Sequence, residues 1–280
     1  NGASEENLSG SYTRLAVVDL EAGNVEAALK YGQKALEIRQ KFADADPADT
    51  GAQHDLSQSH GLLGRFNIKA RQLQEAIEHF EKSIAIQQNL SLTDQTNAEA
   101  QLALSRLYGD FGGALFLADK LTEARLSYEK KQDICQKLLA ANPNNAEARR
   151  ALLISYEMLG NLFVQSGKLN EAIEQCEKEV AVTQKWAAAN LNDTQENAQA
   201  QYDFFVSLHR LATIQRQAKA FSEAIASYEK ELEVLDRLAT FPQQKEWVAN
   251  TKQAIKQCKL TALATGDWSR IEALPHREQQ

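Results

Sequence analysis

The sequence has few residues that break helices and no long apolar segment. Only four prolines and 13 glycines occur in 280 residues, and 43 % of the chain is apolar, as is typical of a folded helical protein. No stretch approaches the 18 consecutive apolar residues that indicate a membrane-spanning helix. The opening residues are polar and lack the basic start of a signal peptide. We expect no membrane partner, and the missing initiator methionine indicates an excised fragment or a processed chain.

Basic residues are also in the minority. The chain has 31 lysines and arginines against 38 aspartates and glutamates, which gives a formal net charge of −7. A protein that binds a polyanion normally presents a basic face to it. We therefore expect no nucleic-acid partner.

Cysteine and histidine are too scattered to suggest a disulfide framework or a metal site. The three cysteines at positions 135, 176 and 258 form no CxxC pair, and an odd number cannot all pair within one chain. This usage favours a reduced, cytoplasmic setting. Cys176 and Cys258 fall at repeat positions that favour a small buried side chain. The five histidines lie in five different sequence contexts without an HExxH motif. No metal site is predicted.

Sequence motifs for catalysis are missing as well. The chain contains no GxSxG elbow, no GxxxxGK[ST] phosphate loop and no GxGxxG after a strand. The nearest glycine-rich segment, YGDFGGA at 108–114, lies inside an expected helix, where glycine permits close helix packing. We predict that the chain is not an enzyme, with no catalytic residues and no cofactor.

A helical pattern recurs along almost the whole chain. Five alanines mark its copies at intervals of 48, 48, 48 and 52 residues: Ala28, Ala76, Ala124, Ala172 and Ala224. Around each alanine, apolar and small residues recur every three or four positions, which predicts an amphipathic helix. A second helical stretch precedes each one and ends in a turn, where Gly167 can adopt the positive φ that helix ends favour. The pattern predicts two antiparallel helices per unit.

The residues at fixed offsets in these units resemble the tetratricopeptide repeat (TPR) family. The fourth unit carries the signature best, with Tyr156, Leu159-Gly160, Phe163, Gly167 and Ala172. The second, third and fifth units repeat parts of it in phase. The resemblance implies an all-α fold, a right-handed α-solenoid of antiparallel helix pairs.

The period of 48 exceeds the family's period of about 34, which corresponds to roughly two extra turns on each helix. We predict one repeat domain over 1–280, with five elongated repeats and a degenerate C-terminal capping unit. The boundaries fall as follows: units 1–46, 47–94, 95–142, 143–190 and 191–242, and a cap at 243–280. The segment 188–201, which accounts for the longer 52-residue interval, is either a protrusion that contacts a partner or a longer helix end.

In the family, the first helix of each unit lines a concave groove. The resemblance maps this groove onto the following residues: Arg65, Ile68, Lys69, Arg106, Phe116, Leu117, Glu157, Asn161, Val164, His209, Thr213 and Arg216. Arg65 and Lys69 are like charges one helical turn apart, which an acidic ligand could offset. Alternatively, Glu21 or Asp110 neutralises them.

An apolar row in the same helices has two interpretations. Leu20, Ile68, Phe116 and Val164 recur at the 48-residue period and either pack one unit on the next or form an exposed stripe for a helix or peptide. The lysine and asparagine clamp with which some family members grip chaperone tails would fall on Thr13 and Val17. A chaperone-tail adaptor is therefore not expected.

The predicted function is protein–protein interaction. We interpret the chain as a scaffold that binds a protein or peptide in the concave groove and serves as the interaction or sensing module of a larger signalling protein. Two alternatives stay open: a peptide-sensing regulator whose groove changes curvature, and a self-associating structural module. A hydrolytic enzyme would need a Ser/Cys–His or metal constellation, which the sequence does not supply. The partner and the oligomeric state do not follow from the sequence.

Overall fold

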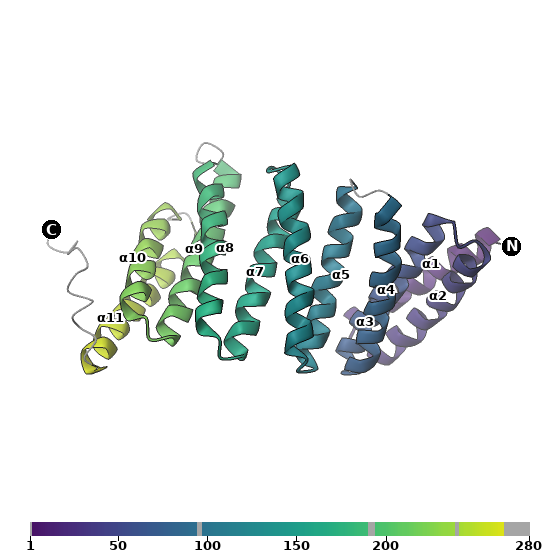
Figure 1. The fold of residues 1–280 in the computed structure, drawn as a ribbon, viewed down its shortest axis with the longest axis horizontal. Coiled ribbons are helices and arrows are strands. Elements are labelled where there is room, and N and C mark those ends of the chain that lie inside the picture. The colour runs from purple at the N-terminus through teal and green to yellow at the C-terminus, as the bar shows by residue number, and fades with distance from the viewer. Residues whose placement is uncertain (1, 94–96, 190–193, 239–240, 266–280) are drawn as a thin grey trace. The chain divides into compact units, whose positions relative to one another are not determined.

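The computed structural model describes residues 2–93, 97–189, 194–238 and 241–265, and all regular structure in those segments is helical. Figure 1 shows the helices in chain order. Their bounds are α1 Gly2–Glu21, α2 Val25–Ala45, α3 Thr50–Lys69, α4 Leu73–Thr93, α5 Ala98–Leu117, α6 Leu121–Ala141, α7 Ala146–Gln165, α8 Leu169–Ala189, α9 Thr194–Gln217, α10 Phe221–Arg237 and α11 Gln244–Thr265. None of these helices is long and apolar enough to cross a membrane.

The helices pack in sequence order within two compact units, Asn1–Ser155 and Tyr156–Gln280. In the first unit, α1 packs on α2, α3 on α4 and α5 on α6, and each pair contacts the next through α2 with α3 and α4 with α5. In the second unit, α8 packs on α9, α9 on α10 and α10 on α11. The predicted fold class, an all-α solenoid of antiparallel helix pairs, is confirmed.

The five signature alanines lie at the centre of these contacts. Each of them has an exposed fraction of 0 %: Ala28, Ala76, Ala124, Ala172 and Ala224. A small side chain at each of these buried positions lets the paired helices approach closely. The three cysteines are also buried and unpaired, and the sequence had predicted this burial for Cys176 and Cys258. Cys258, for example, packs with Ala212 and Ala224 in the core of the second unit.

Every turn inside a helix pair contains one residue in the left-handed region. Gly167 has a φ of 70°, as its position predicted, and Gly23 has a φ of 82°. At the equivalent places the chain uses Arg71, Asp119 and Lys219, with φ of 59°, 59° and 62°. The backbone N–H of Lys168 then donates to the carbonyl of Phe163 at 2.8 Å, which closes the preceding helix in a Schellman-like turn. The turn geometry is therefore conserved within the chain even where glycine is replaced.

Side-chain caps begin the first helices of successive pairs. The Asp49 carboxylate accepts from the N–H groups of Gly51 and Ala52 at the start of α3. Asn97 accepts from Ala100 at the start of α5, and Asn145 accepts from Ala148 at the start of α7. Because caps satisfy backbone donors that a helix leaves free, they fix where each helix begins. Asp49, Asn97 and Asn145 are spaced by the same 48 residues as the alanines.

The longer fourth interval is explained by the length of α9. This helix has 24 residues, whereas α3, α5 and α7 have 20 each. The helix end is therefore longer, which was one of the two interpretations of segment 188–201; residues 190–193 lie outside the described residues. In the expected C-terminal cap, α11 ends at Thr265, and the rest of the cap, 266–280, also lies outside the described residues.

Candidate interaction surface on the first helices

The predicted groove residues divide between the two units. Arg65, Ile68 and Lys69 lie on α3 and Arg106, Phe116 and Leu117 on α5, all in the first unit. Glu157, Asn161 and Val164 lie on α7 and His209, Thr213 and Arg216 on α9, in the second. Six of the twelve are exposed and the other six are half-buried. No predicted groove position is thus lost to the core.

In the first unit, ion pairs join successive first helices. Nε of Arg65 on α3 lies 2.7 Å from Oδ2 of Asp110 on α5. Nη2 of Arg106 on α5 lies 2.7 Å from Oε1 of Glu147 on α7. Two explanations were offered for the like charges of Arg65 and Lys69: an acidic ligand, or neutralisation by Glu21 or Asp110. In the structure, Asp110 neutralises Arg65. Lys69 is exposed, and no ion pair joins it to another described residue.

The apolar row is half-buried in every helix that carries it. Leu20, Ile68, Phe116 and Val164 all retain part of their surface. Leu20 packs against the core of the first helix pairs, so at that position the packing interpretation holds. The more accessible apolar residue is the neighbour of Phe116, Leu117, whose exposed fraction is 57 %. An apolar contact for a partner on α5 would therefore be made by Leu117.

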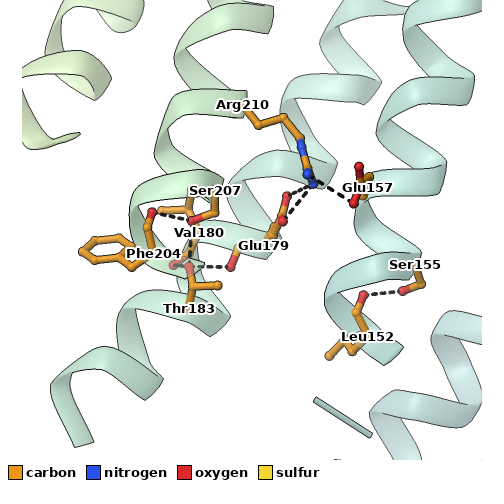
Figure 2. A network of polar contacts seen from close by, with 9 residues as sticks. All are labelled: Leu152, Ser155, Glu157, Glu179, Val180, Thr183, Phe204, Ser207 and Arg210. Atoms are coloured by element: carbon orange, nitrogen blue, oxygen red, sulfur yellow. Dashed lines mark hydrogen bonds and ion pairs between the residues drawn. The ribbon is translucent and has the colours of Figure 1, made fainter. Parts of the chain in front are cut away.

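In the second unit, one guanidinium joins two carboxylates. Figure 2 shows Arg210 on α9 between Glu157 on α7 and Glu179 on α8. Nη1 of Arg210 donates to both oxygens of Glu179 at 2.9 Å, and its Nη2 lies 3.2 Å from Oε2 of Glu157. Glu179 is buried, and this burial raises its pKa to about 7, although Arg210 acts in the opposite direction. The arrangement holds α7, α8 and α9 together through a single cation.

A small pocket lies beside His209, between α9, α10 and α11. Its volume is about 240 Å³, and it is lined by Phe205, Val206, His209, Glu231, Trp247, Asn250 and Thr251. The rings of Phe205 and Trp247 stack with centroids 5.1 Å apart. Glu231 is completely buried at the pocket, where its Oε1 accepts from Thr251 Oγ1 at 2.5 Å. Both Glu231 oxygens lie 3.2 Å from Nδ1 of His209, and this hydrogen bond raises the pKa of His209.

Among these pocket residues, the sequence reasoning identified only His209. Glu231 and Glu179 were not among the predicted site residues, although both come seven residues after a signature alanine. Seven residues are two helical turns, so these positions share the buried face of Ala224 and Ala172. An acidic residue seven positions after a signature alanine was therefore the sequence signal that could have identified Glu179 and Glu231. Trp247 lies in the expected cap, where no groove residue was sought.

No site for a metal ion is apparent in the described segments. They contain no group of three or more histidine, cysteine or acidic side chains that could hold one. The nearest arrangement is a pair, His60 on α3 and His79 on α4, whose Nδ1 atoms are 2.9 Å apart. Such a distance corresponds to a hydrogen bond between two neutral rings, in which one Nδ1 donates and the other accepts.

Comparisons with known proteins agree with this architecture. Models of the tetratricopeptide repeat match residues 8–46 and 57–90. No curated protein sequence matches the chain. Among solved structures, TPR-like repeats of a kinesin light chain from Podosopora anserina are 20 % identical, with a TM-score of 0.56, over 86 % of this chain and 97 % of that one. Aspartyl phosphate phosphatase F from Bacillus subtilis is 12 % identical, with a TM-score of 0.50, over 89 % of this chain and 60 % of that one. At these identities, the likeness concerns the fold.

Proposed function

We propose that this chain, which carries tetratricopeptide repeats at residues 8–46 and 57–90, is a scaffold that binds another protein or a peptide through its first helices. The observation that carries the proposal is the accessibility of the predicted groove positions. None of the twelve is buried, although they lie on helices whose other faces form the core. In the first unit, a surface that combines the cations of Arg65, Lys69 and Arg106 with the apolar Leu117 is suited to protein recognition.

The ion pairs between first helices support this function because they fix side chains before a partner arrives. Arg65 and Arg106 are held by Asp110 and Glu147, so less side-chain entropy is lost on binding. Exposed pairs of this kind add little to stability, roughly 0–1 kcal/mol each. Lys69 and Leu117 stay accessible beside them. We infer that the paired arginines shape the surface and that Lys69 and Leu117 supply contacts.

The wider role remains the one that the repeat pattern suggested, an interaction or sensing module of a larger signalling protein. A cytoplasmic location is supported by Cys135, Cys176 and Cys258, which are all unpaired, because oxidising compartments favour disulfides. A non-catalytic role is in keeping with a repeat fold that typically serves as an interaction scaffold.

The regulator that changes curvature is the second candidate, and one contact favours it. The Arg65 and Asp110 pair connects α3 to α5 across 45 residues of sequence, so a charged ligand that breaks it would remove one link between two neighbouring first helices. Exchanging the two residues, Arg65→Asp with Asp110→Arg, preserves the pair and reverses its polarity. A ligand that acts through this pair would lose its effect in the exchanged variant, whereas a ligand bound elsewhere would keep it. Self-association is tested separately by the dependence of mass on concentration.

The main test compares two double variants of equal composition in affinity capture from the source cells. The first variant, Lys69→Glu with Leu117→Gln, alters α3 and α5. The second variant, Lys82→Glu with Leu126→Gln, makes the same changes at exposed positions of the second helices α4 and α6. We expect a partner captured by the wild type to be lost with the first variant and retained with the second. The reverse result would move recognition to the second helices and refute the proposal.

A further inference from the structure

One position of the repeat carries a buried ionisable group in three consecutive units. It lies seven residues after the signature alanine, on the second helix of each pair. The five residues at this position are all buried: Ala35, Ser83, Lys131, Glu179 and Glu231. Ala35 shows that the fold accepts an apolar side chain there. Because burying a charge is costly, packing does not explain Glu231.

Glu231 differs from Glu179 in what compensates its charge. Glu179 is held by two hydrogen bonds from a guanidinium, whereas Glu231 accepts from a hydroxyl and a single imidazole nitrogen. A carboxylate has about four acceptor sites, so Glu231 retains capacity for another donor. Its neighbour in this hydrogen bond, His209, has a side chain that is 50 % exposed and can turn towards solvent. The carboxylate also lines the pocket beside Phe205 and Trp247.

We propose that this pocket binds one cationic side chain, a lysine or an arginine, of a partner protein, with its charge directed at Glu231. The inference rests on the proposed function and names the chemistry of the partner at this point. Phe205 and Trp247 line the pocket, and aromatic rings attract cations, tryptophan most strongly. Their apolar surface also suits the aliphatic stem of such a side chain.

The size and charge of the pocket agree with this occupant. Its volume of about 240 Å³ is below the roughly 300–1,000 Å³ of sites for whole small molecules, and it fits a single side chain. The chain's net charge of −7 favours the approach of a basic partner. An opposing charge comes from Arg216 on α9, which acts on His209 and whose Nη1 donates to Gln257 on α11 at 3.4 Å. In the free protein, His209 occupies the place that the partner's cation takes.

Two other occupants would use the same space differently. An acidic side chain could accept from His209 but would face the Glu231 carboxylate and the negative faces of two rings. A neutral apolar side chain could fill the walls without using Glu231. Both are distinguishable from a cation by probes of matched size.

The experiment uses the amino-acid probes themselves, so that it does not depend on a partner. The whole chain is labelled with 5-fluorotryptophan, and the Trp247 fluorine signal is assigned with Trp247→Phe. Nα-acetyl-lysine methylamide is titrated beside its norleucine and glutamate counterparts. We expect the lysine probe to shift the Trp247 signal saturably at millimolar concentration and the norleucine probe to bind at least tenfold more weakly. The Trp186 signal should stay in place and serves as the internal reference.

Three variants make the outcome specific to the carboxylate. Glu231→Gln keeps the shape of the side chain and the hydrogen bond from Thr251, and it should lower the affinity for the lysine probe at least tenfold. Glu229→Gln removes an exposed charge from the same helix and should leave its affinity unchanged. His209→Gln keeps a donor to Glu231 without a positive charge, and it should bind the lysine probe several-fold more tightly than the wild type. A purely structural His209–Glu231 pair would not produce that gain.

Equal binding of the norleucine probe, tighter binding of the glutamate probe, or wild-type affinity in Glu231→Gln would each overturn the proposal. If Glu231→Gln does not fold, the test rests on His209→Gln. If this variant does not bind the lysine probe more tightly than the wild type, the proposal that a cation displaces His209 from Glu231 is refuted. The proposed function can fail independently, since capture through Lys69 and Leu117 concerns the other unit. If the pocket binds the lysine probe but no partner is captured, the pocket proposal is supported and the proposed function is not.

Discussion

The ring of Tyr128 on α6 lies against the backbone of Gly112 on α5, in the space that a Cβ atom at position 112 would occupy. The neighbouring Gly113 has no atom within 4 Å of the corresponding position. Gly64 and Phe80 repeat the first relationship one unit earlier, where a Cβ would lie 2.8 Å from the ring. In the fourth unit Cys176 replaces the aromatic residue, and its sulfur would lie 3.8 Å from a Cβ at Gly160. The glycine and the aromatic of the signature are therefore one packing unit.

This packing predicts opposite effects of alanine at two adjacent glycines. Gly112→Ala should lower the free energy of unfolding by roughly 1–3 kcal/mol, because the methyl group overlaps the Tyr128 ring. Gly113→Ala should raise it by about 0.5–1 kcal/mol, because alanine favours the helix and the space is open. Urea unfolding followed by circular dichroism measures both. Changes of the same sign would contradict this account of the helix contact.

The left-handed turn residues predict a gain in stability. Arg71→Gly should raise the free energy of unfolding by roughly 0.5–1 kcal/mol, since the relief of a positive φ exceeds the entropy that glycine loses on folding. Lys219→Gly should behave alike. The matched opposite change, Gly167→Ala, should lower stability by about 1–2 kcal/mol. The same unfolding experiment is suitable, and a loss of stability in both glycine variants would refute the prediction.

The buried Glu179 predicts that mild acid stabilises the second unit. Its pKa is raised from 4.5 to about 7, mainly by burial, so between these values the folded state binds more protons than the unfolded one. This contribution to stability is present below pH 4.5 and is lost as the pH rises through about 7, by on the order of 3 kcal/mol. Glu179→Gln should remove that part of the pH dependence.

The measurement for Glu179 is hydrogen exchange of α8 and α9, corrected for intrinsic rates, between pH 5 and pH 8. Glu177→Gln, an exposed neighbour on the same helix, is the control and should keep the wild-type profile. Identical profiles for the wild type and Glu179→Gln would show that Arg210 keeps the carboxylate ionised throughout.

The His60 and His79 pair predicts the opposite response in the first unit. Burial lowers the pKa of His60 to about 4, with smaller effects from His79 and Lys82, and burial also lowers the pKa of His79. The stability that neutral His60 contributes is present above its unfolded pKa of 6.5 and is lost as the pH falls from 6.5 towards 4. Protection of α3 and α4 should therefore decline over that range.

Nuclear magnetic resonance can follow the His60 ring directly while exchange is measured. In His60→Gln, the amide can still bond to His79 but does not titrate, so the loss of protection on acidification should be smaller. A His60 ring that titrates near 6.5 in the folded protein would invalidate the prediction.

Much of the fold could be predicted because its determinants are local and repeated. The alanine row recurs at intervals of 48 and 52 residues, and the Gly112 and Tyr128 pair has a counterpart 48 residues earlier in Gly64 and Phe80. The turn glycine at Gly167 has a counterpart in Gly23, and other residues adopt the same conformation in the remaining turns. Each encodes a helix face, a helix end or a helix contact within about 30 residues of sequence, so periodicity alone indicates it. The positions of the groove residues follow from the same register, and the structure leaves all of them accessible.

The functional detail could not be predicted in the same way. The partners of Arg65 and Arg106 lie 45 and 41 residues away in the next repeat, and Arg210 selects Glu157 and Glu179 from two different helices. A charge pattern on one helix cannot identify these partners, because long side chains from several helices could meet at the same surface. Trp247 likewise reaches Phe205 from a helix that the repeat signature does not cover.

The sequence by itself determined that this chain is a stack of antiparallel helix pairs, since the burial of one face of each helix leaves few other packings. Only the tertiary structure decided which charges neutralise each other and which carboxylate lines a pocket. The physical reason is that helix formation depends on neighbours in sequence, whereas the environment of a side chain such as Glu231 is set by three helices that meet only on folding.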